Sequence, residues 1–310
     1  MVADNILSPT KKSGFFFVHK KSNMTSHDVV WQIKKKKFNL DKVGHTGTLD
    51  PLASGLLIIC IGKATKLAFL FDHLDKTYQG VFVFNQKYDT LDATGKLIDT
   101  TNIVLNEQLI QNSFACFHQQ TYLQTPPMFS AVKVNGQKMY HLARKNQTIT
   151  LPPKEVTIHH LEAQSNLKDN QISFITRVSK GTYIRSLAQD IASKMNTFGA
   201  LSSLQRIAIG SYSKQLTKTI DALTLDDLVE DISFFATCDK IILNNYLIKL
   251  VKNGIYLDHR QCITEKPFIV QDSNHNFIAY YDVFEKNKYY PRYFFLSLTV
   301  EVLQKQKRKF

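Results

Sequence analysis

The chain has 310 residues, of which 44% are hydrophobic, and its 39 lysines and arginines outnumber 26 acidic residues, giving a formal charge of +13. This length suffices for one large domain and a smaller one, and the apolar content excludes an intrinsically disordered chain. The positive excess favours a nucleic acid or an anionic membrane surface as partner, although a lysine-rich surface can also serve solvation alone. No apolar run is long enough to span a bilayer.

Neither the start of the chain nor its cysteines indicate export or metal binding. Residues 1–13 lack the apolar core of a secretory signal and are expected to form a disordered lead, so a cytoplasmic location is predicted. The four cysteines are widely scattered, without a CxxC pair or histidines at ligand spacing. We therefore expect buried apolar cysteines, no disulfide framework and no metal site.

The N-terminal segment predicts a strand, a helix and a loop in that order. Residues 14–19 are aromatic and β-branched, as in a strand. A helix is expected to begin at Thr25 or Ser26, whose hydroxyl groups can cap it, with Asp28 favoured in its first turn by the helix dipole. Residues 43–54 are punctuated by Gly, Thr and Pro and are expected to form a loop.

Helix-like and strand-like patterns then alternate irregularly. Asn135-Gly136 between two strand-like runs predicts a β-hairpin. The mixture, without a regular βαβ alternation, predicts an α+β fold built on a mixed, mainly antiparallel sheet with flanking helices. The expected helical segments are 64–74, 106–117 and 183–195, and the expected strands are 77–84, 156–158 and 172–178.

The character of the chain changes again towards its C-terminus. Short strand-like runs follow one another from residue 268 onwards, separated by turn residues. We therefore predict a large domain over residues 14–238 and a small β-rich domain over residues 239–310. The second domain is expected to end in the basic tail Lys305, Lys307, Arg308 and Lys309.

The densest group of chemically useful residues is GHTGTLDPLASG, residues 44–55. Its glycines permit unusual backbone angles and Pro51 stiffens the loop, so the Asp50 carboxylate can project into a cleft. Asp-Pro is also a common way to start a turn, which is the structural alternative. A hydrolase triad of His45, Asp50 and Ser54 lacks a G-x-S-x-G elbow, and a phosphate-binding loop lacks its Gly-Lys-Ser/Thr.

Two further segments add candidate side chains. In SKGTYIRSL, residues 179–187, Arg185 stands at the start of a helix, where its guanidinium can pair with a carboxylate. It could equally form an ordinary structural ion pair. In KTYQG, residues 76–80, Tyr78 opens a strand, where it is either a core residue or a platform for an exposed base.

Taken together, these segments resemble one family. GHTGTLDPLASG, KTYQG and SKGTYIRSL, in this order and at these separations, are similar to the bacterial tRNA pseudouridine-55 synthases, the TruB family. The resemblance covers residues 14–215 and includes PPMFSAVKVNGQKMYHLAR (126–144) and LQRIAIG (204–210). It implies isomerisation of a T-loop uridine in tRNA to pseudouridine without a cofactor, and a PUA-like RNA-binding domain at the C-terminus.

The resemblance also implies roles for individual residues. Asp50 matches the essential aspartate of the family, Tyr78 the tyrosine that stacks on the target base, and Arg185 the arginine that pairs with the aspartate. Asp92 matches the acid that positions this arginine, and His45 the histidine that supports the opened T loop. Further pocket positions are matched by Lys20, Tyr183 and Leu204.

The sequence departs from the family pattern at two places. Lys20-Lys21-Ser22-Asn23 stands where the family has Lys-Pro-x-Gly, and Gln205-Arg206 stands where it has two arginines, which removes one possible phosphate contact. Three ways in which Asp50 could act stay open: attack on the base, attack on the sugar, or removal of a sugar proton. A non-catalytic RNA-binding or RNA-folding protein is the competing interpretation. We expect a monomer whose partner is the T arm of tRNA, and no membrane partner.

Overall fold

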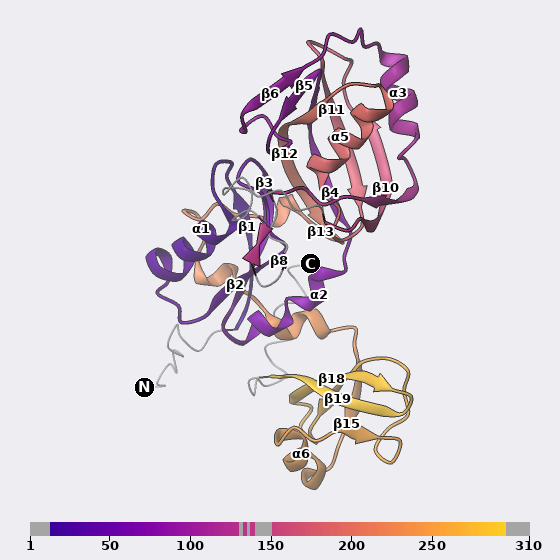
Figure 1. Cartoon of the computed structure of the whole chain (residues 1–310). Coiled ribbons are helices and arrows are strands. Elements are labelled where there is room, and N and C mark those ends of the chain that lie inside the picture. Colours follow the sequence, from indigo (N-terminus) through magenta and orange to yellow (C-terminus); the bar gives the residue numbers. More distant parts are fainter. Residues whose placement is uncertain (1–12, 130–132, 135–136, 140–150, 296–310) are drawn as a thin grey trace.

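The computed structural model describes residues 13–129, 133–134, 137–139 and 151–295. It is an elongated molecule, with β4 and β10–β12 in the upper part of Figure 1, β1–β3 in the middle and the C-terminal domain below. The residues 1–12, the basic tail and most of the segment 130–150 lie outside the described parts. Cys60 is buried, as expected, whereas Cys116 is exposed.

Ten strands of the described chain form one large sheet, with the path β14-β1-β3-β12-β4-β11-β10-β7 and with β2 and β13 paired at its side. Within this sheet the pairing of β12 with β3 is parallel and the others are antiparallel. The strands are β1 (Gly14–Lys20), β2 (Val43–Thr46), β3 (Ser54–Ile61), β4 (Lys76–Phe84), β7 (Gln120–Gln124), β10 (Lys154–Ala163), β11 (Gln171–Val178), β12 (Gly199–Ile209), β13 (Tyr212–Ser213) and β14 (Val229–Glu230).

Helices cover this sheet on both faces, and two short strand pairs stand apart from it. The pairs are β5 (Gln86–Tyr88) with β6 (Leu97–Thr100), and β8 (Lys133–Val134) with β9 (Gln137–Lys138). The helices are α1 (Ser26–Trp31), a π-helix η2 (Gln32–Lys37), η3 (Gly62–Leu67), α2 (Phe69–Asp72), α3 (Glu107–Ala115), α5 (Ile184–Lys194), and the short 3-10 helices η4 (Lys214–Leu216), η5 (Leu225–Asp227) and η6 (Asp231–Phe235).

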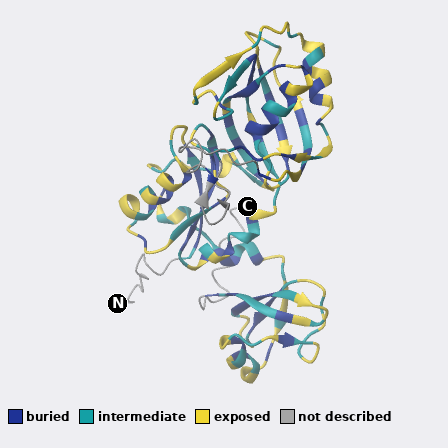
Figure 2. Cartoon of the chain, viewed as in Figure 1, coloured by how far each residue is buried: buried dark blue, intermediate teal, exposed yellow. Residues whose placement is uncertain are grey.

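The central strand β3 is apolar from Leu56 to Ile61 and buried there, because both faces of the sheet are covered. In β1, Phe16 and Val18 pack into the core that includes α1, α3 and α5. Phe15 and Phe17, which point to the opposite face, pack into a second core with α2 and η6. Figure 2 shows this as dark blue strands beneath a mostly exposed outer layer.

Most sequence-based expectations for single elements are confirmed. Thr25 caps α1 through a hydrogen bond from the backbone N–H of Asp28, whose carboxylate in turn accepts from Thr25. Tyr183 is the residue before α5. The strands β8 and β9 pair, with Val134 opposite Gln137, as the expected hairpin requires. The turn Asn135-Gly136 itself lies outside the described residues.

Three expectations need correction or completion. Residues 43–46 form β2 rather than loop, because their backbone pairs with β3 from Val43 opposite Ile61 to Thr46 opposite Ile58. The long strand β12 was not anticipated, although it lies between β3 and β4 at the centre of the sheet. Helix α6 in the C-terminal domain was also missed.

The C-terminal domain is small and mostly β, as predicted. Its sheet has the order β15-β17-β18-β19-β16, with β15 parallel to β17. Its elements are β15 (Asp239–Ile242), α6 (Asn245–Lys252), β16 (Leu257–Asp258), β17 (Phe268–Gln271), β18 (Phe277–Glu285) and β19 (Lys288–Phe294). The predicted α+β class is therefore confirmed, while the exact domain boundaries stay predictions.

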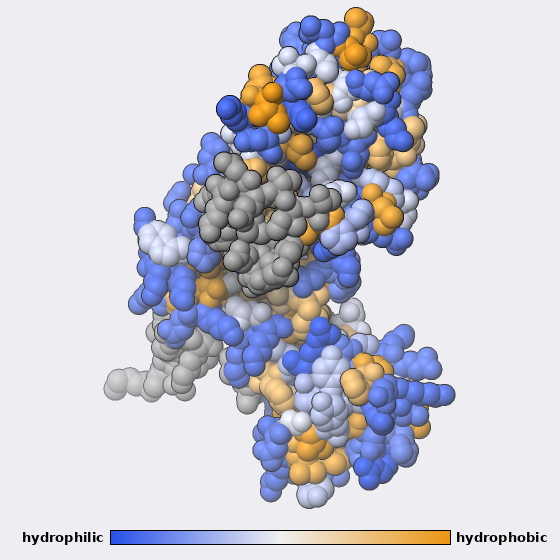
Figure 3. Space-filling model, viewed as in Figure 1, coloured by the Kyte–Doolittle hydropathy of each residue, from blue (hydrophilic) through white to orange (hydrophobic). Residues whose placement is uncertain are grey.

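Aromatic and polar contacts join this domain to the rest of the chain. The ring of Tyr280 lies 4.9 Å from that of Phe235, and the Arg292 guanidinium lies 3.5 Å above the ring of Phe69. The buried carboxylate of Asp231 accepts hydrogen bonds from Ser13 and Tyr293. On the face shown in Figure 3, hydrophilic residues predominate and hydrophobic residues gather only in small groups.

Gly55 allows β3 to approach β12 closely. Its φ is +102°, and a Cβ atom there would lie 2.3 Å from the backbone oxygen of Arg206. We expect Gly55→Ala to lower the free energy of unfolding by more than about 2 kcal/mol, because backbone strain adds to the clash.

Gly181→Ala is the matched control, because Gly181 has φ +81° but nothing within 4 Å of an added Cβ. We expect this variant to lower the free energy of unfolding by only about 1 kcal/mol, from backbone strain alone. Urea unfolding of both variants measures the difference, and equal losses would contradict the close approach.

Candidate active site

The loop of residues 47–53 is fixed at several points of its backbone. The hydroxyl group of Ser26, at the start of α1, accepts from the N–H of Leu49 at 2.9 Å and donates to its carbonyl at 3.1 Å. The N–H of Asn23 donates to the carbonyl of Pro51 at 2.8 Å. A loop held on both sides of Asp50 presents that carboxylate in one position.

The side chain of Asp50 is paired with Arg185. Nε of Arg185 donates to Oδ2 of Asp50 at 2.8 Å. The Arg185 side chain is only 4% exposed, whereas that of Asp50 is 38% exposed. Among the described residues Oδ1 of Asp50 has no hydrogen-bond donor, so one oxygen is anchored and the other is open to an incoming molecule.

The guanidinium of Arg185 is itself held in place. Nη1 and Nη2 donate to the carbonyls of Thr90 and Phe129, each at 2.8 Å. Oδ2 of the buried Asp92 lies 3.9 Å from Nε, and Asp92 accepts from the backbone and side chain of Thr94. All three nitrogens of the guanidinium are therefore occupied, which fixes the plane in which it meets Asp50.

Polar contacts from strand β7 hold the start of helix α5, which carries Arg185. The N–H of Tyr183 donates to Oε1 of Gln124 at 2.8 Å. Gln124 donates to the hydroxyl of Tyr122, which donates to the carboxylate of Asp190 at 2.7 Å. Burial raises the pKa of Asp190, and it also raises the pKa of Tyr122. This buried chain of hydrogen bonds fixes α5 against the sheet.

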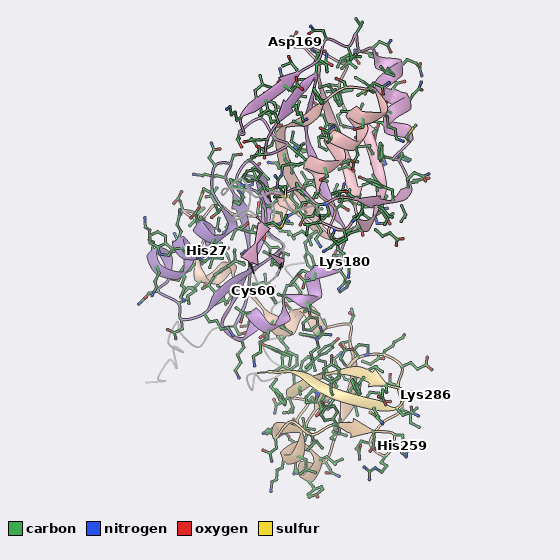
Figure 4. All side chains as sticks on the ribbon, in the orientation of Figure 1. His27, Cys60, Asp169, Lys180, His259 and Lys286 are labelled. Atoms are coloured by element: carbon green, nitrogen blue, oxygen red, sulfur yellow. The ribbon has the colours of Figure 1, made fainter. Side chains whose placement is uncertain are left out.

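A cavity of about 600 Å³ opens beside this ion pair. Its wall includes four residues that the sequence had indicated, namely Asp50, Tyr78, Tyr183 and Leu204. The volume is sufficient for one nucleotide base with its sugar. Lysines also line it, among them Lys180, which Figure 4 labels in the middle of the molecule.

Lys20 contacts the loop of residues 47–53 and does not belong to the cavity wall. Its ammonium group is fully buried and donates to the carbonyls of Lys21, Met24 and Pro51. Burial lowers its pKa from 10.5 to about 8, although Asp50 counteracts this shift. The ammonium group joins the segment after β1 to the loop that carries Asp50.

Lys76, which lines the cavity, also binds three backbone carbonyls through its ammonium group. These are the carbonyls of Phe71, Asp72 and Leu74 at the end of α2. Burial, and to a lesser extent the charge of Arg206, lowers its pKa from 10.5 to about 8.

His45, like Lys20, Arg185 and Asp92, is not among the residues that line the cavity. It lies on β2 opposite Ile59, and its buried Nδ1 has no hydrogen-bond partner within the described chain. Burial and the charges of Arg206 and His27 lower its pKa. The imidazole is therefore neutral at neutral pH.

Over residues 13–129, 133–134, 137–139 and 151–295 no cluster of three or more acidic, histidine or cysteine side chains could hold a metal ion. None of the helices in these ranges has both the length and the apolar content to cross a bilayer.

Known structures share this fold. A structure described as "Crystal Structure of a Cbf5-Nop10-Gar1 Complex" aligns over 88% of this chain and 79% of its own, with a TM-score of 0.63 and 20% identity. Another, "Structure of H/ACA RNP bound to a substrate RNA containing 2'-deoxyuridine", aligns over 92% of this chain and 85% of its own, with a TM-score of 0.62 and 18% identity.

Sequence comparison identifies the family. The pattern described as "TruB family pseudouridylate synthase (N terminal domain)" matches residues 35–184. The protein named tRNA pseudouridine synthase B of Aster yellows witches'-broom phytoplasma is 67% identical over 91% of this chain and all of its own length. The protein of the same name from Acholeplasma laidlawii is 50% identical over 91% of this chain and all of its own length. The chain belongs to the TruB family of pseudouridine synthases.

Sequence reasoning missed the structural role of Arg206. It considered only that one possible phosphate contact is lost at Gln205, and it did not foresee that Arg206 is buried beneath the loop that carries Asp50. An arginine in the middle of an apolar strand is the signal that could have indicated burial, because such a charge needs partners. Gln124 and Lys76 were missed for lack of any distinguishing pattern.

The pKa of Lys20 gives a pH-dependent prediction. Folded protein loses the Lys20 proton near pH 8 and unfolded protein near 10.5. Between these values the unfolded state binds more protons, so the free energy of unfolding should rise with pH relative to a Lys20→Met variant. Below pH 8 the penalty for burying the charge is fully present.

Urea unfolding of both proteins between about pH 7 and pH 10 measures this difference. The Lys20→Met protein is the control for the native protein, because Lys76 is present in both and its titration cancels in the difference. A difference that stays constant over this range would show that Lys20 is not buried as described.

Proposed function

We propose that this protein is a tRNA pseudouridine synthase that isomerises the T-loop uridine at position 55, with Asp50 as its catalytic carboxylate. The observation that carries the proposal is the Asp50–Arg185 contact of 2.8 Å at the wall of a cavity also lined by Tyr78. Membership of the TruB family supports the reaction, and the relatives named tRNA pseudouridine synthase B support the substrate.

The reaction breaks the bond between N1 of the uracil and C1′ of the ribose and forms a bond from C5 to C1′. The proton leaves C5 and N1 gains one, so substrate and product have the same atoms. No electrons are exchanged with another molecule. The chain therefore needs to hold the base, turn it and move a proton.

The free oxygen of Asp50 is suited to the step at the glycosidic bond. Its partner oxygen is anchored by Arg185, so the free carboxylate oxygen can act as a nucleophile or a base in one fixed orientation. Attack on the base, attack on the sugar and removal of a sugar proton all use this oxygen. Tyr78 is our candidate for assisting the loss of the C5 proton, since its ring lines the same cavity.

The target base must leave the folded RNA before it can reach the cavity. Extruding a base costs a few kcal/mol. Stacking on Tyr78 and the net positive charge of the protein offset this cost. In this scheme Tyr183 and Leu204 shape the pocket, and Lys20 and Asp92 hold the loop and the guanidinium. His45 supports the opened T loop from outside the cavity wall.

The direct test is to incubate the purified protein with an unmodified tRNA transcript and to map pseudouridine by chemical labelling. We expect a single modified position, in the T loop. Tight RNA binding without any pseudouridine would favour a non-catalytic RNA-binding protein, and modification elsewhere would contradict the proposed substrate position.

Removal of the Asp50 charge should abolish the reaction. We expect Asp50→Asn to lower the single-turnover rate by at least about 10⁴-fold. Affinity for tRNA should stay nearly the same, because the amide has the shape of the carboxylate.

Asp169→Asn is the matched control, because Asp169 is exposed in a turn and Figure 4 shows it far from Lys180 of the cavity wall. It removes the same charge and should leave the rate unchanged. Comparable turnover by Asp50→Asn and the native protein would refute the assignment.

Arg185 should not be replaceable by lysine. A lysine supplies the charge but not the three fixed nitrogens that meet Asp50, Thr90 and Phe129. We expect Arg185→Lys to lower kcat by about 10²-fold or more, since misplacement of the carboxylate by an ångström has effects of this size. Steady-state kinetics on a tRNA transcript measure it, and a kcat near that of the native protein would contradict the pairing role.

A further inference from the structure

Arg206 is a buried cation at the cavity with part of its guanidinium unused. The residue is only 1% exposed. Nε donates to the carbonyl of Leu56 at 2.8 Å and Nη2 to that of Gly47 at 2.9 Å. The third nitrogen, Nη1, has no acceptor in the described part of the chain, and Arg206 is among the residues that line the cavity.

In the other buried cations nearby, every nitrogen has at least one acceptor. The three nitrogens of Arg185 each have an acceptor, on Asp50, Thr90 and Phe129. Lys20 and Lys76 each donate to three backbone carbonyls. Within the described residues, Arg206 is thus the buried cation of this group that has a nitrogen without any acceptor.

Arg206 also lacks an anionic partner of its own. Among the ion pairs of the described residues, none involves Arg206. Burying an unpaired charge is costly, and two backbone carbonyls compensate for only part of the lost hydration. An anion brought by the substrate would supply the missing partner.

The position of Arg206 suits the backbone of the nucleotide held at Tyr78. Arg206 on β12 lies directly opposite Tyr78 on β4, so both side chains stand on the same face of the sheet. Leu204, two residues earlier on β12, also lines the cavity. A base stacked on Tyr78 therefore has its sugar and phosphates within reach of this arginine.

We propose that Nη1 of Arg206 binds a non-bridging phosphate oxygen next to the everted uridine. A phosphate is favoured over a uracil carbonyl because only the phosphate neutralises the buried charge. The same guanidinium holds the carbonyls of Gly47 and Leu56, which flank the loop carrying Asp50. Arg206 thus ties the RNA backbone to the position of the catalytic carboxylate.

This inference rests on the proposed function, and its test separates the two. A tRNA T-arm stem-loop is made in four forms: unmodified, with a neutral methylphosphonate on the 5′ side of the target uridine, with one on its 3′ side, and with one in the distal stem as control. Single-turnover rates and dissociation constants are measured with the native protein, Arg206→Met and Arg177→Lys. Arg177 is an exposed arginine of β11 outside the cavity wall and serves as the control variant.

With the native protein we expect one of the two flanking methylphosphonates to weaken binding about ten- to hundredfold, the usual range for a charge-assisted hydrogen bond. The distal one should have little effect. In Arg206→Met the same methylphosphonate should cost less than about threefold, since the contact is already lost. Arg177→Lys should respond as the native protein does.

Two results would overturn the inference while leaving the proposed function intact. In the first, the native protein converts the unmodified RNA, and neither flanking methylphosphonate weakens binding more than the distal one does. In the second, a flanking methylphosphonate weakens binding equally in the native protein and in Arg206→Met, which would mean that another group binds the phosphate. If Arg206→Met does not fold, the native protein alone decides through the first comparison. No conversion of unmodified RNA would instead refute the proposed function.

Discussion

The contact between the Asp50 carboxylate and the Arg185 guanidinium is the constraint around which the catalytic domain is arranged. Arg185 is almost fully buried, while Asp50 keeps one oxygen open to the cavity. Such an asymmetric pair fixes the orientation of Asp50 and leaves one of its oxygens available to a ligand. The surrounding hydrogen bonds then act on one of the two partners, since Ser26 fixes the loop of Asp50 and Gln124 fixes the helix of Arg185.

Buried cations form a second layer behind this pair. Lys20, Lys76 and Arg206 donate to backbone carbonyls of the segments that form the cavity, rather than to carboxylates. Each cation thereby joins two or three backbone carbonyls of these segments through hydrogen bonds. Burial is the main cause that lowers the pKa of Lys20 and Lys76, and the charge of Arg206 adds to it. Together these cations favour a polyanion at the cavity.

The sequence indicated the candidate site residues better than it predicted the frame that holds them. Asp50, Tyr78 and Arg185 lie in long motifs, and the structure brings Asp50 into contact with Arg185 and places Tyr78 in the same cavity. The strand β12 was missed because Ser, Gln and Arg interrupt its apolar pattern. That interruption has a physical cause, since Arg206 faces the loop of Asp50 while Gln205 on the other face bonds to Gln79.

The role of Gln124 and the carbonyl contacts of Lys20 could not be predicted in the same way. Backbone carbonyls carry no sequence signature, and their partners lie up to dozens of residues away. The expected loop at 43–46 was wrong for a related reason. Gly44 and His45 have low strand propensity, yet pairing with the buried β3 makes them a strand.

The account is tested most directly by a structure of the Asp50→Asn variant bound to a T-arm stem-loop. It predicts the uracil ring inside the cavity against Tyr78, with the side chain of residue 50 at the bond between base and sugar and Arg185 beside it. A target base that stays stacked in the RNA, or that binds away from residue 50, would contradict it.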